Sequence, residues 1–493
     1  MNFGARLYAE LRGDRVIWMI LLLLSIFSIL AVYSSTGTIA YKLSGGNTTG
    51  YLIKHILILS FGLFLAYLAY LTPYMKFMKL APWLWLIAFC LLVYTLAFGV
   101  EINHAKRWIQ IPFIDLTFQT SDFAKLALIL VVAREITRHK DYIKDFKNAF
   151  MPIIMPIIII CGLIAPSDLS TALVLFATCF AMMFIGRVDV KFLGLLVLLW
   201  IVLFAGLIVI WQFAPDVVRV DTWSTRISEF MSDRADGSFQ NQQAKIAIAN
   251  GEIFGSGPGN SIQRNYLPTP YADFIYAVFC EEYGLVGGFL LLGLYVLLFF
   301  RTTRLVTISE KSFGAMVAIG LSLNIVIQAL CNMGIATHLL PVGGLTLPMV
   351  SWGGTSVLFS CIFFGIILSV SRYIEGANER QLAADTPGAP AAQPGQQQQQ
   401  QQGGGGGQQQ QGGQQQSGQQ QRKDYRDNRD SRGGGGGNYN KGGQGGGGGY
   451  KGGGQGGGGY KGGGGQGGGS GGYKGGGGQG GGGQKREGGG NRS

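Results

Sequence analysis

The acidic residue Asp273 has the position in this 493-residue chain that most strongly suggests chemistry. It stands in the string NYLPTPYADFIYAVFCEEYG (265–284), where a long polar segment gives way to an apolar run. A carboxylate at the mouth of a membrane-crossing segment loses part of its hydration, so it pairs with a cation, shifts its pKa or transfers protons. The alternative is a structural role, because an acid in the first turn of a helix complements the helix dipole.

More polar residues follow Asp273 in stretches that are otherwise apolar. Glu281 and Glu282 come two helical turns later, and Glu281 returns close to the helix face that carries Asp273. Farther along, Asn332 precedes LLPVGGLTLPMVSWGGTS (339–356), a string rich in glycine and proline. Broken backbone at membrane depth usually lines a cavity, so we expect these residues to surround one.

A second group of polar residues lies in NHAKRWIQIPFIDLTFQTSDFAKL (103–126). Lys106 and Arg107 could bind a phosphate group, with Trp108 anchored beside them at the membrane interface. An ordinary interfacial belt of basic and aromatic residues is the alternative interpretation. Asp122 and Lys125 are three residues apart, so they could pair on one face of a helix or line a polar cavity.

The rest of the chain supplies the elements that must position these residues. Its 47% hydrophobic and 13% charged residues are typical of an integral membrane protein. Apolar runs of about 20 residues, enough for a helix to cross a bilayer of roughly 30 Å, recur before residue 377. We therefore expect an all-α polytopic membrane protein of about ten transmembrane helices, spanning approximately 16–36, 51–71, 81–99, 122–138, 148–165, 168–186, 191–213, 271–300, 313–336 and 345–371.

Lysine and arginine in the short loops predict the orientation, since such loops stay in the cytoplasm. They gather before the first predicted helix, after the second, and between the fourth and fifth. Both termini are then cytoplasmic, and the large loop 214–270 between the seventh and eighth helices is extracytoplasmic. Within it we expect a helix in QQAKIAIANGEIFG (242–255) and then a tight turn in GSGPG (255–259). No predicted strand precedes these glycines, which excludes a nucleotide-binding loop.

The domain organisation follows from a sharp change of composition. Residues 1–15 form a cytoplasmic N-terminus, 16–376 the membrane domain and 377–493 a Gly/Gln-rich tail. The tail has too little apolar surface to fold and is expected to be disordered in the cytoplasm. The net charge of +12 is shared between the tail and the cytoplasmic loops, so it does not indicate a nucleic-acid-binding domain. All six cysteines fall inside predicted helices, which argues against disulfides or a metal cluster.

Three strings, in this order, resemble motifs of the SEDS family, the shape, elongation, division and sporulation proteins. They are KRW with FQTSDFAKL (106–126), GNSIQRNYLPTPYADFIYAVFCEEYG (259–284), and LPVGGLTLPMVSWGGTSVLF (340–359) ending in LSVSR (368–372). The resemblance covers about residues 10–376. The second and third strings are more similar to the division members than to the elongation members.

This resemblance implies a glycosyltransferase that polymerises peptidoglycan outside the membrane, joining lipid II units by β-1,4 bonds. Asp273 matches the family's essential aspartate, with the implied role of general base toward the acceptor 4-hydroxyl. The leaving undecaprenyl diphosphate needs cations. The candidate substrate-binding residues are Lys106, Arg107, Trp108, Arg226, Arg264, Gln243, Glu282 and Ser351.

The chain departs from the family pattern at two places. The family's QPSE reads Gln119, Thr120, Ser121 and Asp122 here, which keeps an acid but shortens its reach. Gly343 stands where some division relatives carry a lysine, so that cation is lost. No outside cluster of acids or histidines has metal-ligand spacing, and the use of a divalent cation is left open.

Three other functions remain open from the sequence alone, and the first is a polymerase of the elongation type within the same family. A lipid II flippase would also contain intramembrane charges and broken helices, but its charges should lie near the midplane rather than at the outer edge. A scaffold that only recruits a transpeptidase would tolerate replacement of Asp273. The resemblance further implies lipid II, membrane lipid, a class B penicillin-binding protein and other division proteins as partners, no nucleic acid, and a location in the cell inner membrane at the division septum.

Overall fold

The computed structural model describes residues 13–37, 48–102, 105–111, 116–213, 220–231, 239–308 and 313–385. The chain divides into two units, and all described residues belong to the first, Met1–Gln397. Most of the predicted tail, from residue 386 onward, lies outside the described residues.

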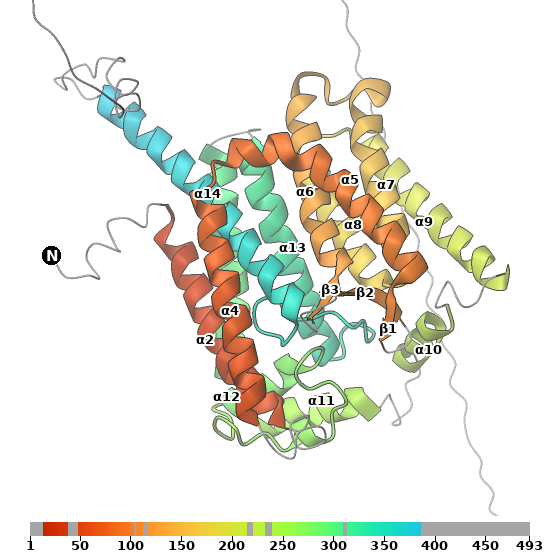
Figure 1. Cartoon of the computed structure of the whole chain (residues 1–493), viewed down its shortest axis with the longest axis vertical. Helices are drawn as coiled ribbons and strands as arrows, with labels where there is room; N and C mark the ends of the chain where they lie inside the picture. The colour runs from red at the N-terminus through yellow and green to blue at the C-terminus, as the bar shows by residue number, and fades with distance from the viewer. Residues whose placement is uncertain are drawn as a thin grey trace, which may run out of the picture. The chain divides into compact units, whose positions relative to one another are not determined.

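Long helices occupy all ten predicted spans within the described part of the chain (Figure 1). They are α2 (Arg15–Ser35), α4 (Thr48–Leu71), α5 (Tyr74–Phe98), α6 (Thr120–Arg138), α7 (Met151–Ile164), α8 (Leu169–Ile185), α9 (Val190–Phe213), α12 (Ile275–Ile308), α13 (Phe313–Ala336) and α14 (Gly354–Asp385). A short π-helix, η2 (Phe146–Phe150), leads into α7. The prediction of a polytopic helical membrane protein is therefore confirmed.

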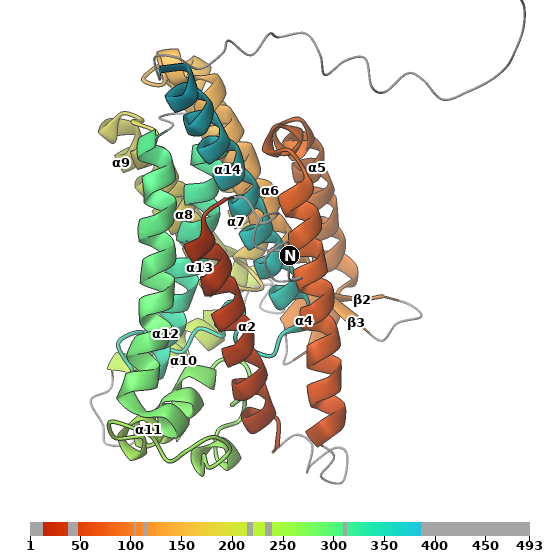
Figure 2. The ribbon, with the colours of Figure 1, turned by 90° about the vertical axis from the view of Figure 1, so that its left-hand side faces the viewer.

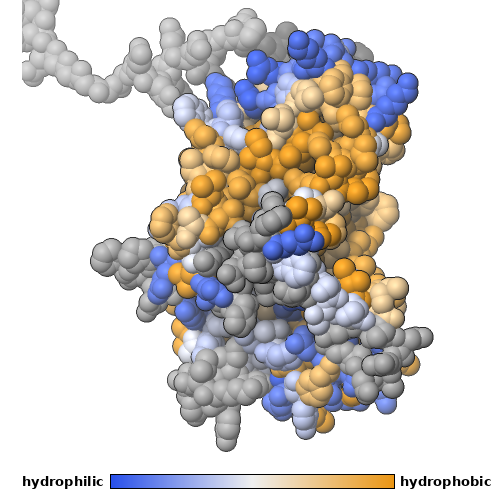
Figure 3. Space-filling view, turned by 90° about the vertical axis from the view of Figure 1, so that its right-hand side faces the viewer, coloured by the Kyte–Doolittle hydropathy of each residue, from blue (hydrophilic) through white to orange (hydrophobic). Residues whose placement is uncertain are grey.

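The surface has the polarity that a bilayer requires. Figure 3 shows a broad hydrophobic band on one face, with hydrophilic residues gathered at one end and mixed polarity at the other. Seven helical segments of the described chain are long and apolar enough to cross a membrane, and α8 and part of α9 form shorter apolar segments. Helix α6 is the exception. It carries several charged side chains, and nearly all of it is buried among the other helices.

Helix α13 occupies the interior of the bundle, which Figures 1 and 2 show from two sides. It packs against α6, α8, α12 and α14. Its sequence, FGAMVAIGLSLNIVIQALCNMGIA, is mostly apolar, contains small residues and is nearly all buried, as expected for a helix that packs against neighbouring helices on most sides. Gly320 is one point of close approach, because a Cβ there would lie 2.6 Å from Met182 Sδ.

A small antiparallel sheet stands where the sequence predicted only a loop. Strands β1 (Val100–Ile102), β2 (Ala105–Ile111) and β3 (Leu116–Gln119) pair in the order β1-β2-β3. Trp108 pairs with Gln119 and Ile109 with Phe118. Side chains alternate between the faces of a sheet, so this register sets Trp108 and Gln119 on one face and the two apolar residues on the other.

The extracytoplasmic segment contains two helices, α10 (Val220–Met231) and α11 (Phe239–Asn250), followed by the 3-10 turn η3 (Gln263–Asn265). The expected helix in this loop is confirmed, although it ends at Asn250. The expected tight turn is also present, since the Asn260 N–H donates to the Gly257 carbonyl at 3.2 Å, and Gly257 and Gly259 both have positive φ.

Three predicted helix starts were wrong, and the first is that of α5, which begins at Tyr74 rather than 81. Helix α12 begins at Ile275 rather than 271, so Asp273 lies in the turn before the helix and not in its first helical turn. Helix α14 begins at Gly354 rather than 345, and it ends at Asp385, beyond the predicted end of the membrane domain. The chain from Thr337 to Gly353 is non-helical and crosses the interior between α13 and α14.

Candidate active site

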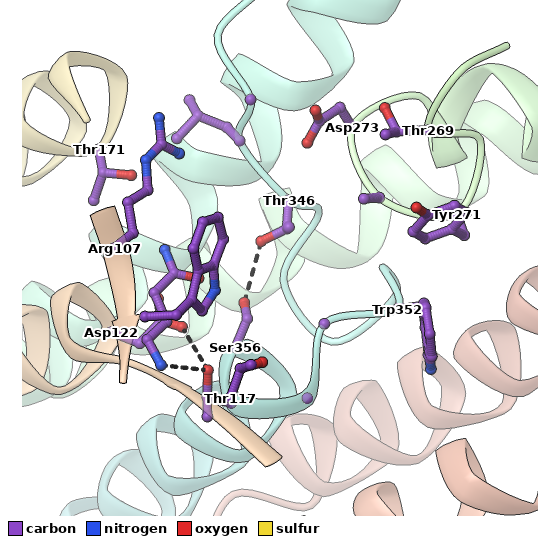
Figure 4. Close-up of a pocket in the computed structure, with 18 of the residues that line it drawn as sticks. Arg107, Thr117, Asp122, Thr171, Thr269, Tyr271, Asp273, Thr346, Trp352 and Ser356 are labelled. Carbon is purple, nitrogen blue, oxygen red and sulfur yellow. Dashed lines mark hydrogen bonds between the residues drawn. The ribbon is translucent and has the colours of Figure 1, made fainter. Parts of the chain in front are cut away.

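A cavity of about 400 Å³ opens beside Asp273 (Figure 4). Strands β2 and β3, helices α6 and α10, the turn before α12 and the broken segment 337–353 all contribute to its lining. The charged side chains that line it are Lys54, Arg107, Asp122, Lys125, Arg226 and Asp273. Four cations thus face two carboxylates, and the cavity suits an anionic ligand.

Asp273 reaches the cavity from the turn 271–274, where the chain enters α12. The Asn332 amide on α13 fixes this turn by donating to the Asp273 carbonyl at 2.9 Å and to the Leu345 carbonyl at 2.6 Å. The side chain is half-buried. Burial raises the pKa of Asp273 to about 6, while the Arg107 and Arg226 guanidinium groups and a hydrogen bond from Thr269 lower it. A carboxyl group with this pKa is suited to accept a proton near neutral pH.

Arg107 projects from β2 and is held by the start of α8. Its Nη1 lies 2.9 Å from Asp168 Oδ2, and its Nε donates to the Ser167 carbonyl at 3.0 Å. Asp168 is the N-cap of α8 and also accepts from the Thr171 hydroxyl at 2.8 Å. This fixed geometry holds one guanidinium at the cavity wall before any ligand arrives.

Arg226 lies on α10, and two aromatic contacts hold this helix against α9 and against the segment after α13. Phe230 packs edge-on against His338 with ring centroids 5.3 Å apart, and Trp223 stacks on Phe204 of α9 at 5.8 Å. These contacts lie on either side of Arg226 in the sequence. The extracytoplasmic loop therefore brings a second guanidinium to the cavity that holds Asp273.

The floor of the cavity is a closed polar network. Lys125 Nζ lies 2.8 Å from Asp122 Oδ1 and 3.1 Å from Gln328 Oε1. Gln328 donates to the Thr346 carbonyl at 2.9 Å, and the Thr346 hydroxyl lies 3.1 Å from that of Ser356. The expected pairing of Asp122 with Lys125 is confirmed, and the aspartate is long enough to reach the lysine.

The broken segment is tied to the turn that carries Asp273. The Ser351 hydroxyl donates to the Ala272 carbonyl at 2.8 Å and accepts from the Leu347 N–H at 2.7 Å. The Trp352 N–H donates to the Tyr271 carbonyl at 2.9 Å. Ser351 itself is outside the cavity lining and acts through these bonds. The expectation that the Gly/Pro-rich string lines a cavity is confirmed by Gly344, Thr346, Trp352 and other residues of this segment.

The structure gathers only part of the predicted site. Arg107, Trp108, Arg226 and Asp273 share one cavity. The side chain of Lys106 lies outside the described part of the chain. The remaining candidates, Gln243 on α11, Arg264 and Glu282, are not among the lining residues of this cavity.

Arg264 and Glu282 meet elsewhere, at the outer end of α2. The Arg264 Nη1 donates to the carbonyl and the hydroxyl of Ser34, both at 3.1 Å, and Ser34 also donates to Glu282. Gly343, which replaces a lysine of some relatives, packs so tightly that a Cβ there would lie 2.9 Å from Ser170 Oγ.

Four important residues of the site were not predicted from the sequence. Asp168 could have been recognised, because it precedes an apolar run as an N-cap does. Lys54, Tyr271 and Trp352 carry no such signal, since each lies at the edge of an apolar segment where an interfacial residue is ordinary. Within the described residues no group of three or more His, Cys, Asp or Glu side chains could hold a metal ion.

Comparisons with known proteins agree with this architecture. The chain is 34% identical over 371 residues to the probable peptidoglycan glycosyltransferase FtsW of Coxiella burnetii, a match that covers 73% of this chain and 96% of the relative. It is 31% identical over 372 residues to the stage V sporulation protein E of Bacillus subtilis, covering 73% and 97%.

Two solved structures share the fold. One, described as a peptidoglycan synthase complex that coordinates polymerization and crosslinking, has a TM-score of 0.58 at 24% identity and covers 73% of this chain and 98% of its own. The rod shape determining protein RodA of Thermus thermophilus has a TM-score of 0.51 at 23% identity, covering 73% and 97%. The model of the cell cycle protein family of FtsW, RodA and SpoVE matches residues 14–376, and the chain belongs to this family, as its motifs predicted.

Proposed function

We propose that this protein is a peptidoglycan glycosyltransferase that joins lipid II units into β-1,4-linked glycan strands. The observation that carries the proposal is the position of Asp273, which shares one cavity with Arg107 and Arg226 and has a pKa of about 6. A base and two guanidinium groups in one cavity suit a displacement in which a hydroxyl loses a proton and a diphosphate leaves. The names of the relatives support the same activity.

The chemistry needs one proton acceptor and one charged subsite. Asp273 accepts the proton of the acceptor 4-hydroxyl as its oxygen attacks the anomeric carbon of the donor. The bond from that carbon to the diphosphate oxygen breaks, and the carbon is inverted. Arg107 and Arg226 stabilise the charge that develops on the leaving undecaprenyl diphosphate, and Arg107 does so without reorganisation because Asp168 and Ser167 hold it.

The floor of the cavity favours polymerisation over transport. Asp122, Lys125, Gln328 and Thr346 bind one another there, and the next turns of α6, through Leu128 and Ile129, are fully buried and apolar. A flippase must let a charged headgroup pass this level, which would require breaking the buried Asp122–Lys125 pair.

We further propose a place in the cell inner membrane at the division septum and a class B penicillin-binding protein as partner. Support comes from the FtsW relatives and from the peptidoglycan synthase complex with the same fold. A divalent cation, if one takes part, would take most of its oxygen ligands from the diphosphate, because the cavity offers only Asp122 and Asp273 as carboxylates.

The test is polymerisation of purified lipid II by the protein reconstituted with its cognate penicillin-binding protein, comparing wild type with Asp273→Asn. Glycan strands from the wild type and a loss of about 10³-fold in the variant are expected from removal of a general base. Thermal unfolding and complex formation are measured on both proteins, because Asn keeps the size of Asp.

Two outcomes would overturn the proposal. Equal glycan synthesis by both proteins would remove Asp273 from the chemistry. Absence of glycan from a folded, partner-bound wild type, together with translocation of a fluorescent lipid II across proteoliposomes, would establish the transporter instead. Chelation by EDTA during the same assay tests the divalent cation.

A further inference from the structure

The two sides of the cavity differ in chemistry (Figure 4). Arg107 provides a cation on one side, and Lys54, Lys125 and Arg226 add further cations to the lining. Tyr271 and Trp352 line another part and carry no charge. Their rings meet edge-to-face, with centroids 5.3 Å apart and planes at 75°. Figure 4 draws these two rings on the far side of Asp273 from Arg107.

The aromatic pair is fixed relative to Asp273 by the backbone. Trp352 N–H donates to the Tyr271 carbonyl at 2.9 Å, and Ser351 donates to the Ala272 carbonyl at 2.8 Å. Tyr271, Ala272 and Asp273 are consecutive, so these two bonds hold the backbone of Trp352 beside the turn that carries Asp273. Tyr51 of α4 also contacts Trp352 edge-to-face, with ring centroids 5.7 Å apart.

Trp352 packs against the hydrophobic core but is not enclosed by it. It is only partly buried and lines the cavity. Contact between a large aromatic side chain and water is unfavourable, so a ligand that covers the indole would gain binding free energy. One face of a pyranose ring presents C–H groups with a slight positive charge. Such a face packs well on the electron-rich face of an aromatic ring.

We propose that Trp352 and Tyr271 form the subsite for the acceptor sugar, while Arg107 and Arg226 hold the donor diphosphate. This inference rests on the proposed glycosyltransferase activity. An acceptor pyranose packed on Trp352 lies next to Asp273, so its free hydroxyl can reach the carboxylate. The donor anomeric carbon then lies between Asp273 and the guanidinium groups. The aromatic pair suits a neutral pyranose and the arginines suit a diphosphate, so the two parts of the cavity bind different portions of the two lipid II molecules.

The experiment separates the two substrates chemically. A lipid II whose 4-hydroxyl is blocked can act only as donor, and a disaccharide methyl glycoside without diphosphate can act only as acceptor. Coupling of these two compounds by the full chain with its partner gives a KM for each. Trp352→Leu should raise the KM of the acceptor roughly fivefold to tenfold and leave that of the donor unchanged, and Trp352→Phe should retain most of the affinity.

The matched control is Trp83→Leu, which removes a tryptophan that is 68% exposed on the lipid-facing side of α5. It should change neither KM. A rise in the donor KM with Trp352→Leu, or no change in either KM, would overturn the inference while leaving the glycosyltransferase proposal intact. Failure of the wild type to couple the two compounds would instead count against the glycosyltransferase itself.

A second measurement covers the case in which Trp352→Leu does not fold. The acceptor-only disaccharide is titrated into wild type and into Trp352→Phe, and tryptophan emission is followed. The acceptor should change the emission of the wild type more than that of Trp352→Phe, which keeps Trp108 in the cavity. Equal changes in both proteins, or none in either, would exclude contact between the acceptor and Trp352.

Discussion

Asp273 and the pair Glu281–Glu282 lie at the same outer end of α12, yet their carboxylates have opposite surroundings. Glu281 and Glu282 are each 1% exposed. Glu281 accepts hydrogen bonds from the Ser261 hydroxyl, from the Ile262 N–H at 3.2 Å and from the Gln263 N–H at 3.2 Å. Asp273 is half-buried, faces a cavity and has the Thr269 side chain as its hydrogen-bond partner.

The glutamates hold the extracytoplasmic loop to a break in α12. Gly284 has a φ of 68° and interrupts the helix. The carbonyls freed around it accept from the loop, with Ser256 N–H bound to the Glu281 carbonyl and Gly257 N–H bound to the Glu282 carbonyl, both at 3.0 Å. The two carboxylates are bound without a ligand, since Ser261 and backbone N–H groups donate to Glu281 and Ser34 donates to Glu282, although Gln263 Oε1 and the Tyr283 hydroxyl nearby are buried without a hydrogen-bond partner among the described residues.

The difference in hydrogen bonding indicates which of these acids can take part in catalysis. An acid whose oxygens are already bound by backbone N–H groups stabilises a fold, and losing it costs stability. An acid left facing cations and a cavity has capacity for a substrate. Depth in the membrane and position on the helix, the features visible in the sequence, do not distinguish the two.

Each of the two sites contains an arginine, Arg107 near Asp273 and Arg264 near Glu282. Replacing these arginines should give the largest difference between the sites. Replacing Arg107 by Gln should lower kcat by about 10²-fold, the usual effect of removing one donor from a developing oxyanion. Arg264→Gln removes the guanidinium that binds Ser34 beside Glu282 and should leave kcat within about twofold, since it is outside the cavity. Both variants are measured as rates of lipid II polymerisation per folded molecule.

An equal decrease in kcat for Arg107→Gln and Arg264→Gln would contradict the distinction between the two sites. Arg107 also pairs with buried Asp168, so its replacement costs some stability, and thermal unfolding in detergent corrects for this. Arg107→Lys sharpens the result. It keeps the charge but cannot bind Asp168 and Ser167 together, and it should fall between wild type and Arg107→Gln.

The second test concerns stability. Glu281→Ala leaves the Ser261 hydroxyl and two backbone N–H groups without their acceptor, which should lower the free energy of unfolding by roughly 3 kcal/mol. The measurement is denaturation of the detergent-solubilised protein. Glu252→Ala, at an exposed acid in the same loop, is the control and should change the free energy by less than about 0.5 kcal/mol. Equal stability of the two variants would show that the Glu281 hydrogen bonds do not contribute to the free energy of unfolding.

The third test is the pH dependence of polymerisation. The base form of Asp273 is the ionised form, and its pKa is about 6. The rate should therefore fall about tenfold for each unit of pH below 6 and become constant above 7. Arg107 lowers this pKa, so Arg107→Gln should move the midpoint to higher pH. A rate that stays constant from pH 5 to 7 would contradict the assignment of Asp273 as base.

Most of the helices could be predicted from the sequence because their apolar runs are long, and α6, which carries several charged residues, is the exception. Asp273 and the broken segment after α13 could also be predicted, since an acid at a helix mouth and a Gly/Pro-rich string are local signals. The strands β2 and β3 could not, because both are short and consecutive apolar residues interrupt the alternation of β2. The sheet matters to the site, since it carries Arg107 and Trp108.

The sequence failed where the outcome depends on long-range partners. Glu282 and Arg264 are charged residues near Asp273 in the sequence, but Ser34 of α2 binds both of them away from the cavity. Lys54, from the second predicted span, lines the cavity instead. The packing of α2 and α4 against the other helices determines where Arg264, Glu282 and Lys54 lie. No local sequence pattern predicts this packing.

The smallest expected effect is a gain of stability when Asp273 is replaced by the neutral residue Asn. Burial raises the pKa of Asp273 in the folded protein above its value in the unfolded chain, so the unfolded chain loses the proton first as the pH rises from about 4 to 6. Ionisation therefore costs the wild type stability across this window, and the cost stays constant at higher pH. Asp273→Asn avoids it and should melt roughly 2 °C higher than wild type at pH 8.

The same comparison at pH 4 should show almost no difference, because the wild-type carboxyl is then protonated in the folded protein. Glu281→Gln is the opposite control. It replaces an acceptor of three hydrogen bonds by a weaker one and should lower the melting temperature at pH 8. If Asp273→Asn also melts below wild type at pH 8, the guanidinium groups stabilise the Asp273 carboxylate in the free protein, and the site is organised as an ion pair before the substrate arrives.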